Sequence, residues 1–208
     1  MQSPGSQALL FDLGGVLVDI DLGRALRAWS VYSPLSSQEL TQTFRFDEQY
    51  ERHERGEIPA DAYFDHVAST LKLSATREQV ESGWNSIFVG EISTTRRLVE
   101  SARRTMPCYA FTNTNASHMA RWSKLFPGVV GAFDRIFASH EIGMRKPERR
   151  AFEHIYYATG LPASSFTFFD DLPDNIDAAI DAGLKAVLVR TPHDVESALR
   201  NLGHDCRA

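Results

Sequence analysis

The feature that most constrains this chain is the order of its short apolar runs, each of which is followed by polar residues. These runs cover residues 8–11, 107–111, 135–138, 166–169 and 186–189. Several are continuously apolar rather than alternating, which is typical of parallel strands covered on both faces. Helical patterns over 93–105, 116–125, 147–159, 174–182 and 193–202 separate or follow the later runs. The alternation predicts an α/β fold with a doubly wound, Rossmann-like parallel sheet.

The first gap between these runs breaks the alternation. Most of it has helical character, and we expect helices over 23–32, 37–46, 48–55, 59–71 and 76–88. Ser36, Ser37 and Asp61 are typical of helix starts, and Gly56 is typical of a helix end. We therefore predict an α/β core of residues 1–19 and 91–208, with a helical cap of residues 20–90 inserted after the first strand.

Chemically reactive side chains follow the first four expected strands. In chain order they are Asp12, Thr112 with Asn113, Lys146, and Asp170 with Asp171. Each alone fits an ordinary turn or cap, but the carboxyl ends of parallel strands meet at one edge of a sheet, where ligands bind. Carboxylates suit Mg²⁺ together with a substrate phosphate, and a lysine neutralises a carboxylate or phosphate oxygen. A carboxylate beside the metal can attack phosphorus and form an aspartyl-phosphate.

These strings resemble the four ordered motifs of the haloacid dehalogenase-like hydrolase superfamily. They read Phe-Asp12-Leu-Gly-Gly-Val, Phe-Thr112-Asn113, Arg-Lys146-Pro147 and Phe-Phe-Asp170-Asp171. The match spans the chain, and the helical insert falls where the superfamily has a type 1 cap. Longer strings, among them residues 53–58, are similar to those of bacterial α-D-glucose-1-phosphate phosphatases. The resemblance implies a Mg²⁺-dependent phosphatase that hydrolyses a small phosphomonoester, a sugar phosphate such as glucose 1-phosphate.

The resemblance also implies roles in phosphoryl transfer. Asp12 would be the nucleophile, and Lys146 would pair with Asp12 and with a phosphoryl oxygen. Thr112 and Asn113 would bind the phosphoryl group that is transferred. Water would then attack the aspartyl-phosphate and release inorganic phosphate.

The same resemblance implies a metal site. Its protein ligands would be Asp12, the backbone carbonyl of Gly14, and Asp171. Asp170 would stand behind these ligands or orient a water on the metal. The expected cofactor is therefore Mg²⁺.

The chain departs from the superfamily pattern at Gly14. Most of its phosphatases have a second aspartate at that position, which protonates the leaving alcohol and later activates water. Such acid–base help is worth roughly 10²–10⁴-fold, and glycine supplies none. Three explanations stay open: another acid replaces it, the leaving group needs less help, or the protein binds its ligand without rapid turnover.

Candidate replacement acids are Asp19, Asp21, His53 and Glu54. His53 and Arg55 are also candidates for contact between the cap and a substrate. Each has a structural alternative: Asp21 fits a helix N-cap, Asp19 fits a turn, and residues 53–55 fit a solvated helix end.

Two alternative functions remain. A dehalogenase-type hydrolase of the same fold also lacks the second aspartate, but carbon–halogen displacement needs no Mg²⁺, so the paired acids at 170 and 171 favour phosphoryl transfer. A non-catalytic phosphometabolite-binding protein is compatible with Gly14, but it does not need Asp12, Lys146 and Asp171 together.

The composition of the chain limits the kinds of partner that it is expected to bind. The 22 Lys and Arg residues against 27 Asp and Glu residues give a net charge of -5, which disfavours nucleic acid. No apolar run approaches the ~18 residues of a membrane span, and the N-terminus has no basic region typical of a secretory signal. Cys108 and Cys206 cannot make a disulfide framework. We expect a cytoplasmic protein whose partner is a small phosphorylated metabolite, with the oligomeric state left open.

Overall fold

The computed structural model describes residues 7–204 and is organised around a five-stranded sheet of order β5-β4-β1-β6-β7. Every neighbouring pair of these strands is parallel. The strands are β1 (Ala8–Phe11), β4 (Cys108–Thr112), β5 (Arg135–Ala138), β6 (Phe166–Asp170) and β7 (Lys185–Leu188). The predicted α/β fold with a doubly wound parallel sheet is confirmed.

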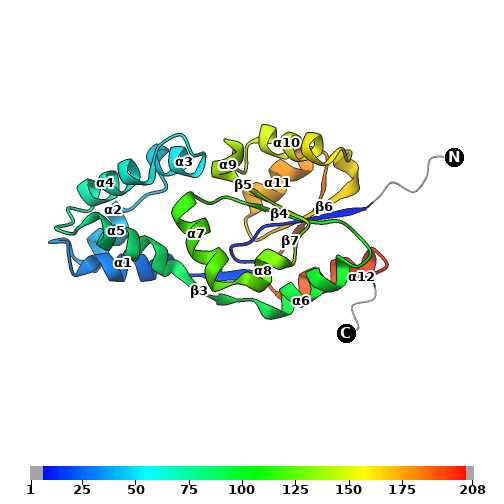
Figure 1. The fold of residues 1–208 in the computed structure, drawn as a ribbon, viewed down its shortest axis with the longest axis horizontal. Coiled ribbons are helices and arrows are strands. Elements are labelled where there is room, and N and C mark those ends of the chain that lie inside the picture. Colours follow the sequence, from blue (N-terminus) through cyan, green and yellow to red (C-terminus); the bar gives the residue numbers. More distant parts are fainter. Residues whose placement is uncertain (1–6, 205–208) are drawn as a thin grey trace.

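Helices cover both faces of this sheet (Figure 1). Leu9 and Phe11 of β1 pack into a cluster with α6 (Ser93–Ala102), α7 (Ala116–Leu125), α8 (Pro127–Gly131) and α12 (Pro192–Asn201). Ala8 and Leu10 belong to a second cluster with α10 (Arg149–Thr159) and α11 (Pro173–Asp181). Successive residues of a strand point to opposite faces, so a strand buried on both sides must be apolar throughout.

The segment between β1 and β4 contains a helical group beside one end of the sheet (Figure 1). Its helices are α1 (Leu22–Ser30), α2 (Ser37–Thr43), α3 (Glu48–Glu54), α4 (Ala60–Thr70) and α5 (Arg77–Trp84). They share a hydrophobic cluster drawn from this segment alone, with Trp29, Tyr63 and Trp84 among its buried members. The exact division at residues 20 and 90 stays a prediction.

A short antiparallel ribbon, absent from the sequence prediction, joins this helical group to the sheet. It pairs β2 (Val18–Ile20) with β3 (Phe88–Glu91). The sequence pattern assigns residues 76–88 to one helix, but α5 ends at Trp84 and continues only as the 3-10 turn η1 (Asn85–Ile87). β2 and β3 contain Asp19, Gly90 and Glu91, so neither has the continuous apolar run that marks the strands of the sheet.

Most predicted helix starts are correct because local capping determines them. Asp21 accepts a hydrogen bond from the Gly23 N–H at 2.8 Å and caps α1. Ser36 caps α2, and Gly56 follows α3 with a φ of +68°. Asp61 is an exception, since it lies in the first turn of α4 and the N-cap is Pro59.

Other short elements were not predicted: α9 (Ser139–Ile142) and the 3-10 turn η2 (Ala163–Ser165). The thiol of Cys108 is buried, as expected, whereas Cys206 lies outside the described residues. Between residues 7 and 204, no helix has both the length and the apolar content to cross a bilayer.

Candidate active site

The residues that the sequence places after four separate strands, except Asp170, line one cavity of about 380 Å³. Its polar lining residues include Asp12, Thr112, Asn113, Lys146, Asp171 and Asn175. These side chains surround the carboxyl ends of β1, β4 and β6, and the rest of the lining comes from the helical segment, the β2–β3 ribbon, α7 and neighbouring loops. Parallel strands therefore bring together groups that lie up to about 160 positions apart in the chain.

Lys146 is the centre of the polar end. Its Nζ lies 2.9 Å from Asp12 Oδ1 and 2.6 Å from Asp170 Oδ2, and its side chain is 1% exposed. Burial by itself lowers the pKa of Lys146, but the charges of Asp12 and Asp170 outweigh it and raise the pKa. The ammonium group is thus held charged, which offsets the cost of burying the two carboxylates.

Asp12 carries the most perturbed carboxyl of the motif set. Burial, together with the charges of Asp170 and Asp171, raises the pKa of Asp12 to about 7, although Lys146 acts to lower it. Carboxylate oxygens of these three aspartates lie within 4.8 Å of one another. One ammonium cannot neutralise three carboxylates, so the site has an excess of negative charge. An all-oxygen donor set with that excess fits a hard divalent cation such as Mg²⁺.

The two adjacent acids of the fourth motif have different environments. Asp170 is fully buried and accepts hydrogen bonds from the Leu172 N–H at 2.9 Å and from Asn175 Nδ2 at 3.0 Å. Asp171 is half-buried and lines the cavity, and burial and Asp170 raise its pKa. The sequence analysis missed Asn175, whose only signal is its place in the first turn of the helix that follows the two acids.

The glycine next to Asp171 is required by close packing. Gly15 has a φ of +71°, and a Cβ at this position would lie 2.3 Å from Asp171 Oδ2. A side chain there would strain the backbone and displace the carboxylate. Gly15 therefore lets the loop after β1 approach the acids that follow β6.

Asn113 ties two loops together. Its Nδ2 donates to the Lys146 carbonyl at 2.9 Å, and its Oδ1 accepts from the Lys146 N–H at 2.8 Å. This pair of hydrogen bonds fixes the backbone of Lys146 beside β4. Thr112, 5% exposed, ends that strand and also lines the cavity. The roles of both residues toward a phosphoryl group stay predictions.

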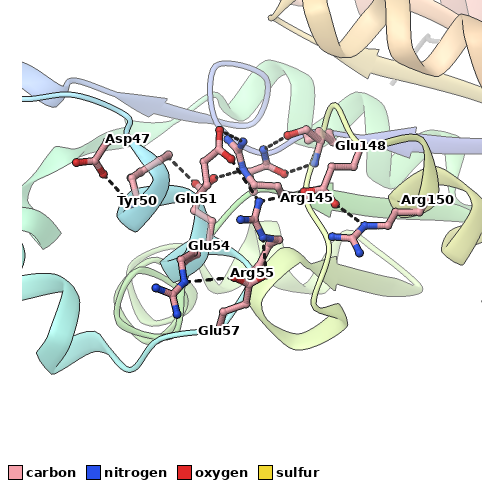
Figure 2. A network of polar contacts seen from close by, with 12 residues as sticks. Asp47, Tyr50, Glu51, Glu54, Arg55, Glu57, Arg145, Glu148 and Arg150 are labelled. Atoms are coloured by element: carbon pink, nitrogen blue, oxygen red, sulfur yellow. Dashed lines mark hydrogen bonds and ion pairs between the residues drawn. The ribbon is translucent and has the colours of Figure 1, made fainter.

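A polar network connects the helical segment to the loop that carries Lys146 (Figure 2). Glu54 of α3 accepts hydrogen bonds from the Tyr50 hydroxyl at 2.6 Å and from Arg145 Nε at 2.9 Å. Glu54 is 3% exposed, and burial raises its pKa despite the opposing charge of Arg145. Tyr50, Glu54 and Arg145 all line the cavity.

Arg55 makes a second bridge between the same parts. Its Nη1 lies 3.1 Å from Glu148 Oε1, just after the Lys146 loop, and its Nε lies 2.7 Å from Glu57 Oε1 (Figure 2). Arg55 is therefore occupied by carboxylates and is not among the residues that line the cavity.

The remaining acid candidates lie away from the cavity lining. Asp19 is exposed on β2, and Asp21 caps α1 and pairs with Arg27 at 2.7 Å. His53 is buried, with its ring stacked 4.5 Å from that of Tyr63, and burial lowers its pKa to about 4. Of the four acids suggested by the sequence, Glu54 alone lines the cavity.

Comparison with known proteins identifies the family. The family model of haloacid dehalogenase-like hydrolases matches residues 7–183. The chain belongs to this hydrolase family. Its four motifs are those that converge on the cavity, so the sequence resemblance is confirmed at the level of the family.

Relatives of this hydrolase are named for different activities and substrates. D-ribitol-5-phosphate phosphatase of Bacteroides thetaiotaomicron is 23% identical over 85% of this chain and 88% of that protein. Sesquiterpene phosphatase astK of Aspergillus oryzae is 28% identical over 86% of this chain and 87% of that protein. The chain also matches drimenol cyclase drtB of Aspergillus calidoustus, but it spans only 36% of that protein's length.

A solved structure shows the same architecture. The HAD family enzyme BT-2542 of Bacteroides thetaiotaomicron, in a magnesium complex, superposes with a TM-score of 0.82 at 25% identity. The match covers 94% of this chain and 99% of that one. The helical segment is thus part of an architecture that the two hydrolases share.

The position at which this hydrolase lacks the second aspartate lies under an apolar side chain. A Cβ built on Gly14 would lie 3.2 Å from Ile20 Cδ1, and Ile20 lines the cavity. Glycine at position 14 therefore leaves room for Ile20 at the entrance to the polar end.

Proposed function

We propose that this hydrolase is a Mg²⁺-dependent phosphatase that cleaves a small phosphomonoester through an aspartyl-phosphate on Asp12. The observation that carries the proposal is the buried Lys146 ammonium, 2.9 Å from Asp12 and 2.6 Å from Asp170, at the polar end of a cavity. An isolated catalytic carboxylate there would be repelled by the neighbouring acids. Lys146 lowers the pKa of Asp12, against burial and the neighbouring acids, and so favours the ionised carboxylate that attacks phosphorus.

The proposed reaction has two steps. Asp12 attacks phosphorus, the bond from phosphorus to the ester oxygen breaks, and the alcohol leaves with a proton. Water then attacks the aspartyl-phosphate and gives a proton back to the acid that protonated the alcohol, which releases inorganic phosphate and restores both the Asp12 carboxylate and the acid. Lys146 and the backbone donors of the loop after β4 offset negative charge on the phosphoryl oxygens throughout.

Mg²⁺ would be held by Asp12, the Gly14 carbonyl and Asp171, with Asp170 behind them. When bound, it neutralises the substrate phosphate and the carboxylate excess described above. Asp170 is already committed to Lys146, Asn175 and the Leu172 N–H, so its contribution is to hold the site rigid.

We propose that Glu54 supplies the proton that Gly14 cannot. Its carboxyl lines the cavity, and burial raises its pKa, which increases the protonated fraction near neutral pH. Tyr50 and Arg145 fix its orientation. Under this assignment the general acid comes from the helical cap rather than from the loop after β1.

The substrate is a small phosphorylated metabolite. Sequence resemblance favours a sugar phosphate such as glucose 1-phosphate, and the ribitol phosphate specificity named for one relative supports that class. The sesquiterpene phosphatase supports an apolar alcohol instead. We also predict a cytoplasmic location and a division of the chain into a core of residues 1–19 and 91–208 and a cap of residues 20–90.

Release of inorganic phosphate tests the function. The purified protein is incubated with a panel of phosphomonoesters, with Mg²⁺ and with EDTA, and we expect release only with the metal. No release from any ester would overturn the phosphatase, and saturable phosphate binding without turnover would favour the binding-protein alternative. Halide release from a 2-haloacid without Mg²⁺ would favour the dehalogenase.

A further inference from the structure

Beyond the phosphate end and Glu54, the cavity has an apolar half whose apolar side chains take no part in the proposed phosphatase chemistry. Its apolar lining residues include Val18, Ile20, Phe46, Trp84, Phe88 and Trp122. They come from the β2–β3 ribbon, the helical segment and α7, so five separate pieces of chain converge there. A pocket that is continuous with the phosphate end must receive the part of the substrate that is attached to the phosphate.

The mouth of this half is also apolar. Ile20, Phe46 and Leu172 line the cavity, and they are 46%, 60% and 53% exposed. Apolar side chains exposed around one opening are a feature of binding sites for apolar groups. The entrance therefore offers contact area to a hydrocarbon rather than hydrogen bonds to a polyol.

The polar side chains of Tyr50, Arg145 and His118 in this half are already paired with protein groups, whereas the buried Trp84 Nε1 has no hydrogen-bond partner among the described residues. The Tyr50 hydroxyl and Arg145 Nε both donate to Glu54, at 2.6 and 2.9 Å. His118 Nε2 donates to the Trp84 carbonyl at 3.1 Å, and the two rings stack at 4.4 Å. A sugar hydroxyl would find few free partners there, and each buried hydroxyl without one costs binding free energy.

We propose that the substrate of this site is the phosphate monoester of an apolar alcohol, with an alkyl, prenyl or single-ring group in the half lined by Ile20, Phe46 and Trp84. The inference rests on the proposed phosphatase function for its reaction, and on the lining of the cavity for its substrate class. A volume of about 380 Å³ is at the lower end for ligand sites, which favours one short chain or ring.

The first test is a chain-length series. Ethyl, butyl, hexyl and octyl phosphate are esters of primary alcohols with equivalent leaving groups, so differences in kcat/KM report binding of the chain. We expect kcat/KM to rise about two- to fourfold per methylene until the cavity is full. Glycerol 3-phosphate, ribitol 5-phosphate and glucose 1-phosphate serve as polar comparisons and should fall below hexyl phosphate.

The second test uses a matched pair of isoleucines. Ile20→Asn places an amide at the mouth and should lower the octyl-to-ethyl ratio of kcat/KM about tenfold. Ile180→Asn alters an isoleucine of similar exposure, 53%, on α11 away from the cavity and should leave the ratio unchanged. If Ile20→Asn is poorly folded, Phe46→Ser at the rim tests the same contact.

The outcomes separate the two proposals. A flat chain-length series, or faster cleavage of the polyol phosphates, overturns the apolar substrate and leaves the phosphatase intact. Absence of any cleavage overturns the phosphatase. In that case calorimetric binding of the matching alkylphosphonates decides the inference: affinity that rises with chain length supports it, and affinity independent of chain length overturns it.

Discussion

The two halves of the cavity are built in opposite ways. The phosphate half contains buried charges held by strand ends, with Lys146 within 3 Å of two carboxylates. The other half consists of single apolar side chains contributed by several elements, and its Tyr50 and Arg145 side chains both donate hydrogen bonds to Glu54. The first half is charged and held by hydrogen bonds and ion pairs. The second half is apolar and is formed by the helical segment, the β2–β3 ribbon and α7.

The difference follows from what each half must do. Attack on phosphorus requires atoms placed to within a few tenths of an ångström, which the register of a parallel sheet provides. Recognition of an apolar group needs only area and shape, so residues on an inserted segment can change without disturbing the chemistry. Variants in the first half should therefore abolish turnover, and variants of the apolar side chains in the second should redistribute it among substrates.

Asp12→Asn should have the largest effect. It removes the nucleophile and nearly preserves volume, so we expect kcat to fall about 10⁴-fold or more while the fold is retained. Steady-state phosphate release measures this, with circular dichroism as the check on folding. Asp177→Asn on the exposed side of α11 is the control and should retain full activity. Undiminished release after Asp12→Asn would show that Asp12 is not the nucleophile.

Asp171→Ala should have the next largest effect. Losing a metal carboxylate should cost about 10²–10³-fold in kcat and abolish the response to added Mg²⁺. A Mg²⁺ titration of phosphate release measures both. A variant that kept the wild-type titration curve would contradict the ligand assignment, whereas Asp177→Ala should keep that curve.

Glu54→Gln tests whether the cap half contributes to the chemistry. As a general acid Glu54 must be protonated, so activity should decline as pH rises through its pKa, which burial raises. The variant should lower kcat about 10²-fold and remove this alkaline decline. Glu51→Gln is matched, because Glu51 also contacts Arg145, at 3.1 Å, but does not line the cavity. If the two variants have the same pH profile, Glu54 only positions Arg145.

The smallest expected effect concerns protein stability at the contact between His118 of α7 and Trp84 of the helical segment. Burial lowers the pKa of His118 to about 3, whereas an unfolded histidine titrates near 6.5. The unfolded chain therefore binds more protons below pH 6.5, so stability present above that pH is lost as the pH falls toward 3.

We expect His118 to account for about 3–5 °C of Tm per pH unit in this window. His118→Phe should reduce the slope of Tm against pH, as measured by thermal unfolding from pH 7 to 4. His193→Phe, at a side chain 75% exposed on α12, should leave the slope unchanged. Equal slopes in both variants would show that His118 does not carry the pH dependence.

The phosphate half was largely predictable from sequence. Continuous apolar runs mark strands, parallel strands bring their carboxyl ends together, and the residues after those ends must meet. Asn175 was not predicted as a site residue because an asparagine at a helix start has many ordinary structural roles. The β2–β3 ribbon was not predicted because its strands contain Asp19, Gly90 and Glu91 and lack a continuous apolar run. The position of Ile20 over Gly14 was therefore not predicted either.

The sequence by itself determined the order of the motifs, the α/β architecture and the chemistry that their shared edge can support. Tertiary structure alone decided which cap residues enter the cavity. His53, Glu54 and Arg55 are consecutive, yet successive residues at a helix end point about 100° apart. Packing of α3 against α4 buries His53 on Tyr63, leaves Arg55 among carboxylates, and turns Glu54 into the cavity. No local pattern fixes that rotation, because it depends on contacts between helices.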